Sequence, residues 1–413
     1  MKTTAGRWLI GLALVCATAS AAPVFAEWNK GLEAYNKKDY ATAAKEFEEV
    51  TKTNPDYVGG YYMLGLSQRA AGNLSAALGS LRKAVELDTA SESPDPRYRI
   101  ALAQALNQAK QYNDAYQALK PLDFSALPAS YRTSYALLLA QAANKTNRSG
   151  EAVNVLKAQV RADSSNAALY QALGVAENEL GNDKAAYAAF KRAYELDPSD
   201  QATGRNAARA GIAVARRSSS EAEKTRTYTE AAQIVERLAS ASPSFDHSLL
   251  AGEAWLGAGD YTKALSWFDK AKAQQPRNAL VHYYIAQSQT SLNRLDSALA
   301  SLQESLNLGS NTDLRTKIYN QMGYVYDKKR DFARAKQAYT EAGNASMARQ
   351  MDEKAAAADA NKEHEAACRE FKLKIDALAM QAEEFEKLGD VESAKQMRDQ
   401  LSVLQRQYND TCR

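Results

Sequence analysis

A stretch from Asn166 to Asp200 recurs along this chain with nearly constant spacing, and this repetition constrains the fold most. Its apolar residues lie three to four apart, which predicts two short amphipathic helices. The turn between them falls at Gly181, because glycine tolerates a positive φ, and Pro198 stops the second helix. Small Gly174 lets the helices approach, and Phe190 fills the space between them. One such pair cannot bury its apolar face alone, so the sequence predicts a stack.

The small residue of the first helix and the large residue of the second recur in other copies. These are Gly31 with Phe47, Gly65 with Leu81, Ala103 with Leu119, Ala140 with Leu156, Gly252 with Phe268, Ala286 with Leu302, and Gly323 with Tyr339. A split copy holds Tyr228, Ala231, Val235 and Pro243. The spacing resembles the tetratricopeptide repeat, a helix–turn–helix unit of about 34 residues. The alternative is an irregular alanine-rich helical bundle.

The resemblance implies an all-α protein: a right-handed α-solenoid of about nine repeats. We expect a signal peptide at 1–26, the solenoid at 27–349, and a capping helix with a C-terminal helical hairpin at 350–413. The nine repeats are expected near 27–57, 58–95, 96–132, 133–166, 167–200, 201–244, 245–278, 279–315 and 316–349. Repeat six is too long by the polar stretch 216–227, RRSSSEAEKTRT. This stretch either extends the helix and turn or forms a mobile loop, and it is either a tolerated insertion or a partner-docking loop.

The N-terminus has the pattern of a secretory leader. Lys2 and Arg7 form a charged start, Trp8–Ala19 is apolar, and small residues precede the expected cleavage after Ala26, with Ala21 as the alternative. The apolar stretch is short for a membrane span. We therefore expect an exported protein, in a bacterial periplasm, whose mature chain has no direct membrane span.

The C-terminal segment has heptad-like apolar spacing on two arms that meet at a turn formed by Gly389 and Asp390, which predicts an antiparallel coiled-coil hairpin. The arms pair Leu388 with Val391 at the turn and Phe371 with Tyr408 towards the open end. The next layer places Cys368 beside Cys412. Cysteine pairs in exported proteins form disulfides, so we expect this bond, worth about 4 kcal/mol on the chain-entropy model; two unpaired thiols are the alternative.

We expect no catalytic residues, no metal site and no cofactor, and therefore no enzyme. The three histidines, His247, His282 and His364, have no second histidine or cysteine at a metal-binding interval. Glycine-rich phosphate loops and nucleophile elbows are missing from the sequence. The formal net charge of +3 without a basic block gives no footprint for nucleic acid.

By the family resemblance, the first helix of each repeat lines a concave groove that binds a protein or an extended peptide. The side chains expected to project into it are Tyr35, Tyr62, Arg69, Gln104, Asn107, Gln141, Asn144, Gln171, Asn178, Glu253, Tyr283, Gln287, Asn320 and Tyr324. Amides can both donate to and accept from a peptide backbone, and tyrosine adds contact area. The chaperone-tail clamp of this family does not carry over, because Trp28 and Leu32 stand at its positions in repeat one.

Two functions fit these features. The first is a non-enzymatic scaffold or adaptor of the bacterial cell envelope, holding partner proteins or peptides in the groove. The alternative is a structural component of an envelope assembly that self-associates through the C-terminal hairpin as a homo-oligomer.

Overall fold

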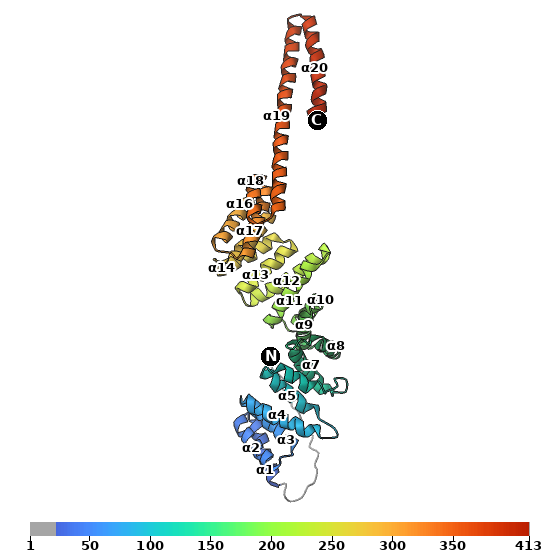
Figure 1. Ribbon diagram of the computed structural model, residues 1–413, viewed down its shortest axis with the longest axis vertical. Coiled ribbons are helices and arrows are strands. Elements are labelled where there is room, and N and C mark those ends of the chain that lie inside the picture. Colours follow the sequence, from blue (N-terminus) through green and yellow to red (C-terminus); the bar gives the residue numbers. More distant parts are fainter. Residues whose placement is uncertain (1–21, 413) are drawn as a thin grey trace. The chain divides into compact units, whose positions relative to one another are not determined.

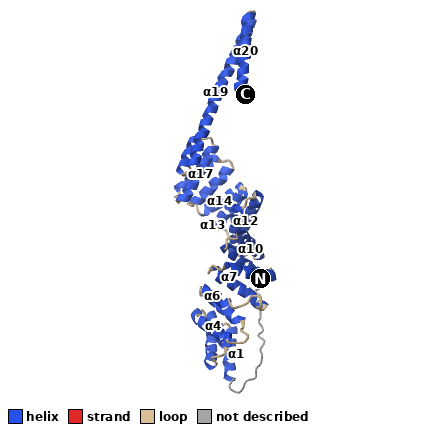
Figure 2. Cartoon of the chain, turned by 45° about the vertical axis from the view of Figure 1, so that its right-hand side comes forward, coloured by secondary structure: helices blue, strands red, loops and turns tan. Residues whose placement is uncertain are grey.

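The computed structural model describes residues 22–412, and all regular secondary structure in this range is α-helical (Figure 2). Most of the expected leader therefore lies outside the described residues. Nine helix pairs come first, in the order that the repeats predict. They are α1 Ala22–Asn36 and α2 Tyr40–Thr53; α3 Val58–Ala70 and α4 Leu74–Thr89; α5 Pro96–Gln108 and α6 Tyr112–Leu119; α7 Ala129–Asn144 and α8 Ser149–Ala162; α9 Ala167–Glu179 and α10 Asp183–Leu196; α11 Gln201–Arg217 and α12 Glu221–Ala241; α13 Phe245–Ala258 and α14 Tyr261–Gln274; α15 Ala279–Ser291 and α16 Leu295–Asn307; α17 Thr312–Lys328 and α18 Phe332–Glu341.

The helices pack in the manner of a helical repeat. Almost every helix contacts the next one along the chain, and the first helices of several neighbouring repeats also touch, as α5 touches α7 and α15 touches α17. The chain separates into two compact units, and the division falls inside α12, between Ile234 and Val235. Each unit is therefore a short stack whose core is shared only between neighbouring helices.

Glycines on the first helices set how closely each pair packs. A Cβ added at Gly174 would lie 2.6 Å from the ring of Phe190, and one at Gly252 would lie 2.4 Å from the ring of Phe268. Both rings are buried. The turn that follows α9 uses Gly181 with φ of 74°, a conformation that strains other residues. These are the spacing and turn roles that the sequence predicts.

The extra residues of repeat six lengthen its two helices and do not form a mobile loop. Most of the stretch 216–227 lies in the end of α11 and the start of α12, and only residues 218–220 join them. The lengthened helices reach back to the start of α10, where Arg217 pairs with Asp183 and Lys184 Nζ lies 3.0 Å from Glu223 Oε1. The insertion is thus anchored to repeat five.

The C-terminal segment consists of α19, Ala345–Lys387, and α20, Val391–Cys412, which lie side by side (Figure 1). The expected capping helix and the first arm of the hairpin form one continuous helix of 43 residues. Its first turns bury Ala348 and Met351 against repeat nine. The expected layer at the turn is not buried, since Leu388 is 74% and Val391 77% exposed.

The open end of the hairpin has the expected partners. The rings of Phe371 and Tyr408 lie 6.2 Å apart, edge to face. One layer further, Cys368 and Cys412 form a disulfide with their Cα atoms 5.7 Å apart. The bond ties the far end of α20 to the middle of α19.

Candidate functional site

Four tyrosines gather on the first helices of the first unit. Tyr35 comes from α1, Tyr62 from α3, Tyr98 from α5 and Tyr131 from α7. The rings of Tyr62 and Tyr98 lie 5.1 Å apart, edge to face, and Tyr62 and Tyr131 pack on the same apolar core. We call these tyrosines, with Arg69 and Arg97, the tyrosine cluster. Four successive repeats therefore contribute to one aromatic surface.

The hydroxyl groups of this cluster are close enough to influence one another. Burial raises the pKa of Tyr62, and the neighbouring hydroxyls of Tyr131, Tyr35 and Tyr98 raise it further, while Arg97 opposes them. Burial likewise raises the pKa of Tyr98. Tyr62 and Tyr98 are therefore neutral at physiological pH. Each phenol of the cluster can donate and accept a hydrogen bond.

The loop before α5 positions Arg97 and Tyr98, the two members of the cluster that come from the third repeat. Buried Asp88 accepts hydrogen bonds from the backbone N–H of Asp95, at 3.1 and 3.0 Å from its two carboxylate oxygens. Asp95 in turn caps α5 by accepting from the backbone N–H of Arg97 at 2.9 Å, and it pairs with Arg97 Nε at 2.6 Å. Pro96 opens the helix, which suits its missing N–H. Tyr98 is consequently held in place by a fixed helix start.

Arg69 differs from Arg97 in having no carboxylate to neutralise it. It is half-buried on α3, makes no ion pair with any described residue, and its buried Nη1 has no hydrogen-bond partner there. It lies near Tyr35, whose pKa burial raises and Arg69 lowers. A guanidinium presents five N–H donors, and leaving a buried donor unsatisfied is costly. The cluster therefore has one positive charge available to an anionic group.

Some of the other groove candidates of the first unit are open to solvent, and others make hydrogen bonds within the fold. Gln104, Gln141 and Asn178 are exposed, and Asn144 is half-buried. Asn107 is buried, and its Nδ2 donates to Leu138 O at 3.0 Å. This contact ties α5 to α7, so Asn107 does not face solvent as a groove residue would. Gln171 Nε2 lies 3.3 Å from Asp200 Oδ2.

In the second unit most candidates serve internal contacts. Tyr283 is buried, and its hydroxyl accepts from Gln287 Nε2 at 2.8 Å. Glu253 accepts from the Tyr284 hydroxyl. Asn320 donates to Thr316 O at 3.0 Å and accepts from Asn344. Tyr324 stands apart, because it is 45% exposed. Most groove candidates of the second unit are thus engaged in contacts within the fold.

Three members of the cluster fall outside the sequence expectation. Arg97, Tyr98 and Tyr131 lie at or near the starts of α5 and α7, each after an irregular connection that contains proline. They do not occupy the repeat positions from which groove residues can be read. The only signal was the concentration of tyrosine beside these connections.

Family models match most of the repeat region. A tetratricopeptide repeat model matches residues 28–94, 62–123 and 137–201, and a second one matches 316–342. The model of the anaphase-promoting complex, cyclosome, subunit 3, matches residues 224–305. The chain is a tetratricopeptide repeat protein. Proteins of this family are typically non-enzymatic scaffolds that bind protein partners. The described residues contain no cluster of side chains suited to a metal ion.

Similar solved structures include MamA proteins and tetratricopeptide repeat proteins. MamA from Desulfovibrio magneticus RS-1, from residue 41 to its end, is 17% identical; the match covers 43% of this chain and 94% of that one, with a TM-score of 0.35. The C-terminal part of a TPR repeat-containing protein from Cytophaga hutchinsonii is 16% identical, with coverages of 60% and 94% and a TM-score of 0.44. No curated protein matches the chain in sequence.

Proposed function

We propose that this tetratricopeptide repeat protein is an exported scaffold of the cell envelope that binds an extended segment of a partner protein across the tyrosine cluster. The placement outside the cytoplasm is supported by the Cys368–Cys412 disulfide, since such bonds persist in oxidising compartments. Among the described residues, no helix has the length and apolar character to cross a membrane.

The observation that carries the binding proposal is the uncompensated charge of Arg69 among tyrosines. Tyrosine rings supply contact area at a low cost in side-chain entropy, and their hydroxyl groups bond to peptide groups. A carboxylate that docks on the solvent-facing side of the half-buried Arg69 guanidinium would neutralise its charge in a charge-assisted contact. The partner segment therefore carries an aspartate, a glutamate or a terminal carboxylate where it passes α3.

Two matched pools of random peptides test this site, one with a fixed central glutamate and the other with glutamine. We expect the full-length protein to retain the glutamate pool at least tenfold better, the effect of a hydrogen bond to a charged group. Arg69→Gln should abolish the preference. Arg192→Gln, which changes an exposed arginine on α10, is the control and should keep it. Equal retention of both pools by the unaltered protein would disprove the proposal.

Self-association through the hairpin is a second candidate function, favoured by a specific surface of α19. Leu373 is 69% and Met380 72% exposed, and they lie seven residues apart, on the same face of the helix. Leu373 and Met380 each come two residues before a buried seam residue, Ile375 and Ala382. Residues two apart lie on nearly opposite sides of a helix, so this face points away from α20. Paired antiparallel with a second copy about the point between Met380 and Gln381, Leu373 of one chain would lie opposite Leu388 of the other.

Sedimentation at rising concentration tests the hairpin surface. We expect a dimer of the full chain, and a monomer for the double variant Leu373→Glu, Met380→Glu, because buried unpaired carboxylates are costly. Val403→Glu changes an exposed apolar residue on α20 outside this surface and should leave the dimer intact. A full chain that stays monomeric at every concentration would remove the second candidate.

A further inference from the structure

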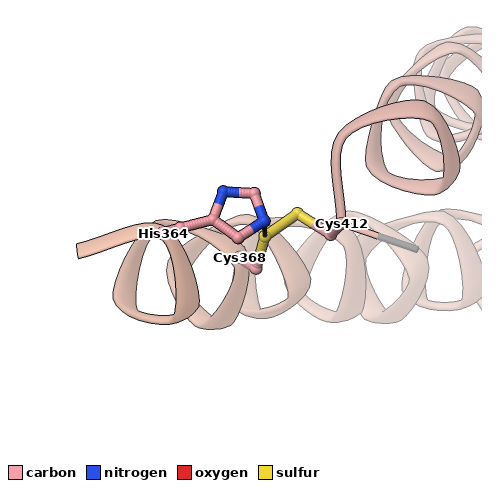
Figure 3. Close-up of a disulfide and its surroundings, with 3 residues drawn as sticks. All are labelled: His364, Cys368 and Cys412. Carbon is pink, nitrogen blue, oxygen red and sulfur yellow. Dashed lines mark hydrogen bonds between the residues drawn. A yellow bond between two sulfur atoms is a disulfide. The ribbon is translucent and has the colours of Figure 1, made fainter. Parts of the chain in front are cut away.

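The two sulfurs of the Cys368–Cys412 disulfide have different surroundings. Cys368 lies within α19, and Cys412 is the last residue of α20 (Figure 3). His364 is one turn before Cys368 on the same helix, and its Nε2 lies 3.7 Å from Cys368 Sγ. Both cysteines are half-buried and His364 is exposed, so a small molecule in solvent can approach the bond.

This asymmetry decides which sulfur better carries a negative charge. An imidazole N–H donates a hydrogen bond to a thiolate, and this hydrogen bond favours the ionised form of the cysteine. Cys368 has such a neighbour in His364. Cys412 has no hydrogen-bond partner among the described residues, and it stands at the C-terminus of a helix, where the helix dipole disfavours an anion.

Thiol–disulfide exchange depends on this difference, because the sulfur that leaves more readily directs the attack to the other one. We propose that the disulfide is a directional exchange site, at which a small-molecule thiolate attacks Cys412 and expels Cys368. The incoming sulfur bonds to Cys412 Sγ, the Sγ–Sγ bond breaks, and its electron pair leaves on Cys368 Sγ. That thiolate accepts a hydrogen bond from His364 Nε2.

The exchange opens the hairpin at the end where α20 stops. A second thiolate then attacks the small-molecule sulfur of the mixed disulfide, and the electron pair of the broken bond leaves on Cys412 Sγ. The protein gains two electrons, and two thiol molecules become one disulfide. Without the covalent link, α20 is held to α19 by the seam, in which Ile375, Ala382 and Ala394 are buried, and by the Arg398–Glu386 ion pair. The hairpin is consequently sensitive to the thiol balance of its compartment.

Short exposure of the full-length protein to glutathione, followed by alkylation and peptide mass spectrometry, tests the direction of attack. We expect glutathione on Cys412 and the alkyl group on Cys368, by at least tenfold over the reverse. His364→Gln should remove this bias and slow the exchange about tenfold, since leaving-group stabilisation is lost. His282→Gln, which changes a histidine on α15, is the matched control and should behave as the unaltered protein.

Helical circular dichroism shows whether each variant folds. Glutathione divided equally between the cysteines, or found mainly on Cys368, would overturn the proposal. So would a folded His364→Gln variant with the bias and rate of the unaltered protein.

Discussion

Residue pairs sixteen apart set the helix spacing in eight of the nine repeats, from Gly31 with Phe47 to Gly323 with Tyr339. The later residue is buried in every case. Where the earlier residue is glycine, the large side chain occupies the space that a Cβ would need, as with Leu81, which would lie 2.6 Å from a Cβ at Gly65. Glycine is unfavourable in the interior of a helix, so its role at these positions is to allow close packing rather than to stabilise the helix.

Gly174→Ala should destabilise the protein for this reason. The added methyl would meet the ring of Phe190, and overpacking of a filled core costs about 1–3 kcal/mol, more than the gain in helix propensity. The control is Gly79→Ala in α4, where a Cβ would meet nothing within 4 Å. It should stabilise by roughly 0.5–1 kcal/mol. Urea unfolding measures both, and changes of the same sign would contradict the spacing role of Gly174.

The contact between repeats five and six gives a pH-dependent prediction. Burial raises the pKa of Glu230, but hydrogen bonds from Lys191 Nζ and the Tyr187 hydroxyl, both at 2.8 Å, outweigh it and lower the pKa below the ordinary 4.5. A lowered carboxyl pKa stabilises the fold above the unfolded value, and this stabilisation is lost as pH falls through the folded value. Thermal unfolding should thus show Glu230→Gln destabilised at pH 7 and close to the unaltered protein near pH 3. A constant difference would contradict this linkage.

At the scale of helices, periodicity was enough to predict the nine pairs, the hairpin turn and the cysteine partners. The boundary of α19 was missed, because the loss of the repeat pattern after residue 349 suggested separate helices. The signal was present, since Ala345–Lys387 contains neither glycine nor proline. Of the tyrosine cluster, repeat register identified Tyr35, Tyr62 and Arg69. The positions of Arg97, Tyr98 and Tyr131 depend on the irregular loops before α5 and α7. The hydrogen bonds from the Asp95 backbone to Asp88 are an example, and no periodic pattern predicts them.

The hairpin and the repeats should respond separately to loss of the disulfide. Cys412→Ser removes a link that spans 44 residues, worth at most about 4 kcal/mol of loop entropy, and only α19 and α20 share it. Amide hydrogen exchange should become faster in α20 and stay unchanged in α13 and α14, since each repeat is stabilised by its neighbours. Faster exchange throughout the second unit would show that the hairpin supports the stack.

At the scale of the molecule, the chain combines a proposed peptide site on the first unit with a proposed pairing surface on α19. A dimer has two peptide sites, so on a surface with closely spaced peptides both sites can bind at once. Such bivalency strengthens binding by about 10²–10⁴ where the geometry lets both sites engage. This gain in binding strength requires no additional contact between the peptide and the tyrosine cluster. The two proposals together therefore predict a behaviour that neither predicts alone.

A peptide recovered from the glutamate pool, immobilised at high and at low density, tests this combination. The full-length protein should dissociate at least tenfold more slowly from the dense surface than from the sparse one. The monomeric variant Leu373→Glu, Met380→Glu should dissociate at the same rate from both, and at the rate of the full chain on the sparse surface, because its tyrosine cluster is unaltered. Arg69→Gln should dissociate from either surface at least tenfold faster than the unaltered protein. If the full chain dimerises in solution yet shows no dependence on density, the geometry of the pair forbids both sites from engaging at once, and the dimer serves assembly rather than capture.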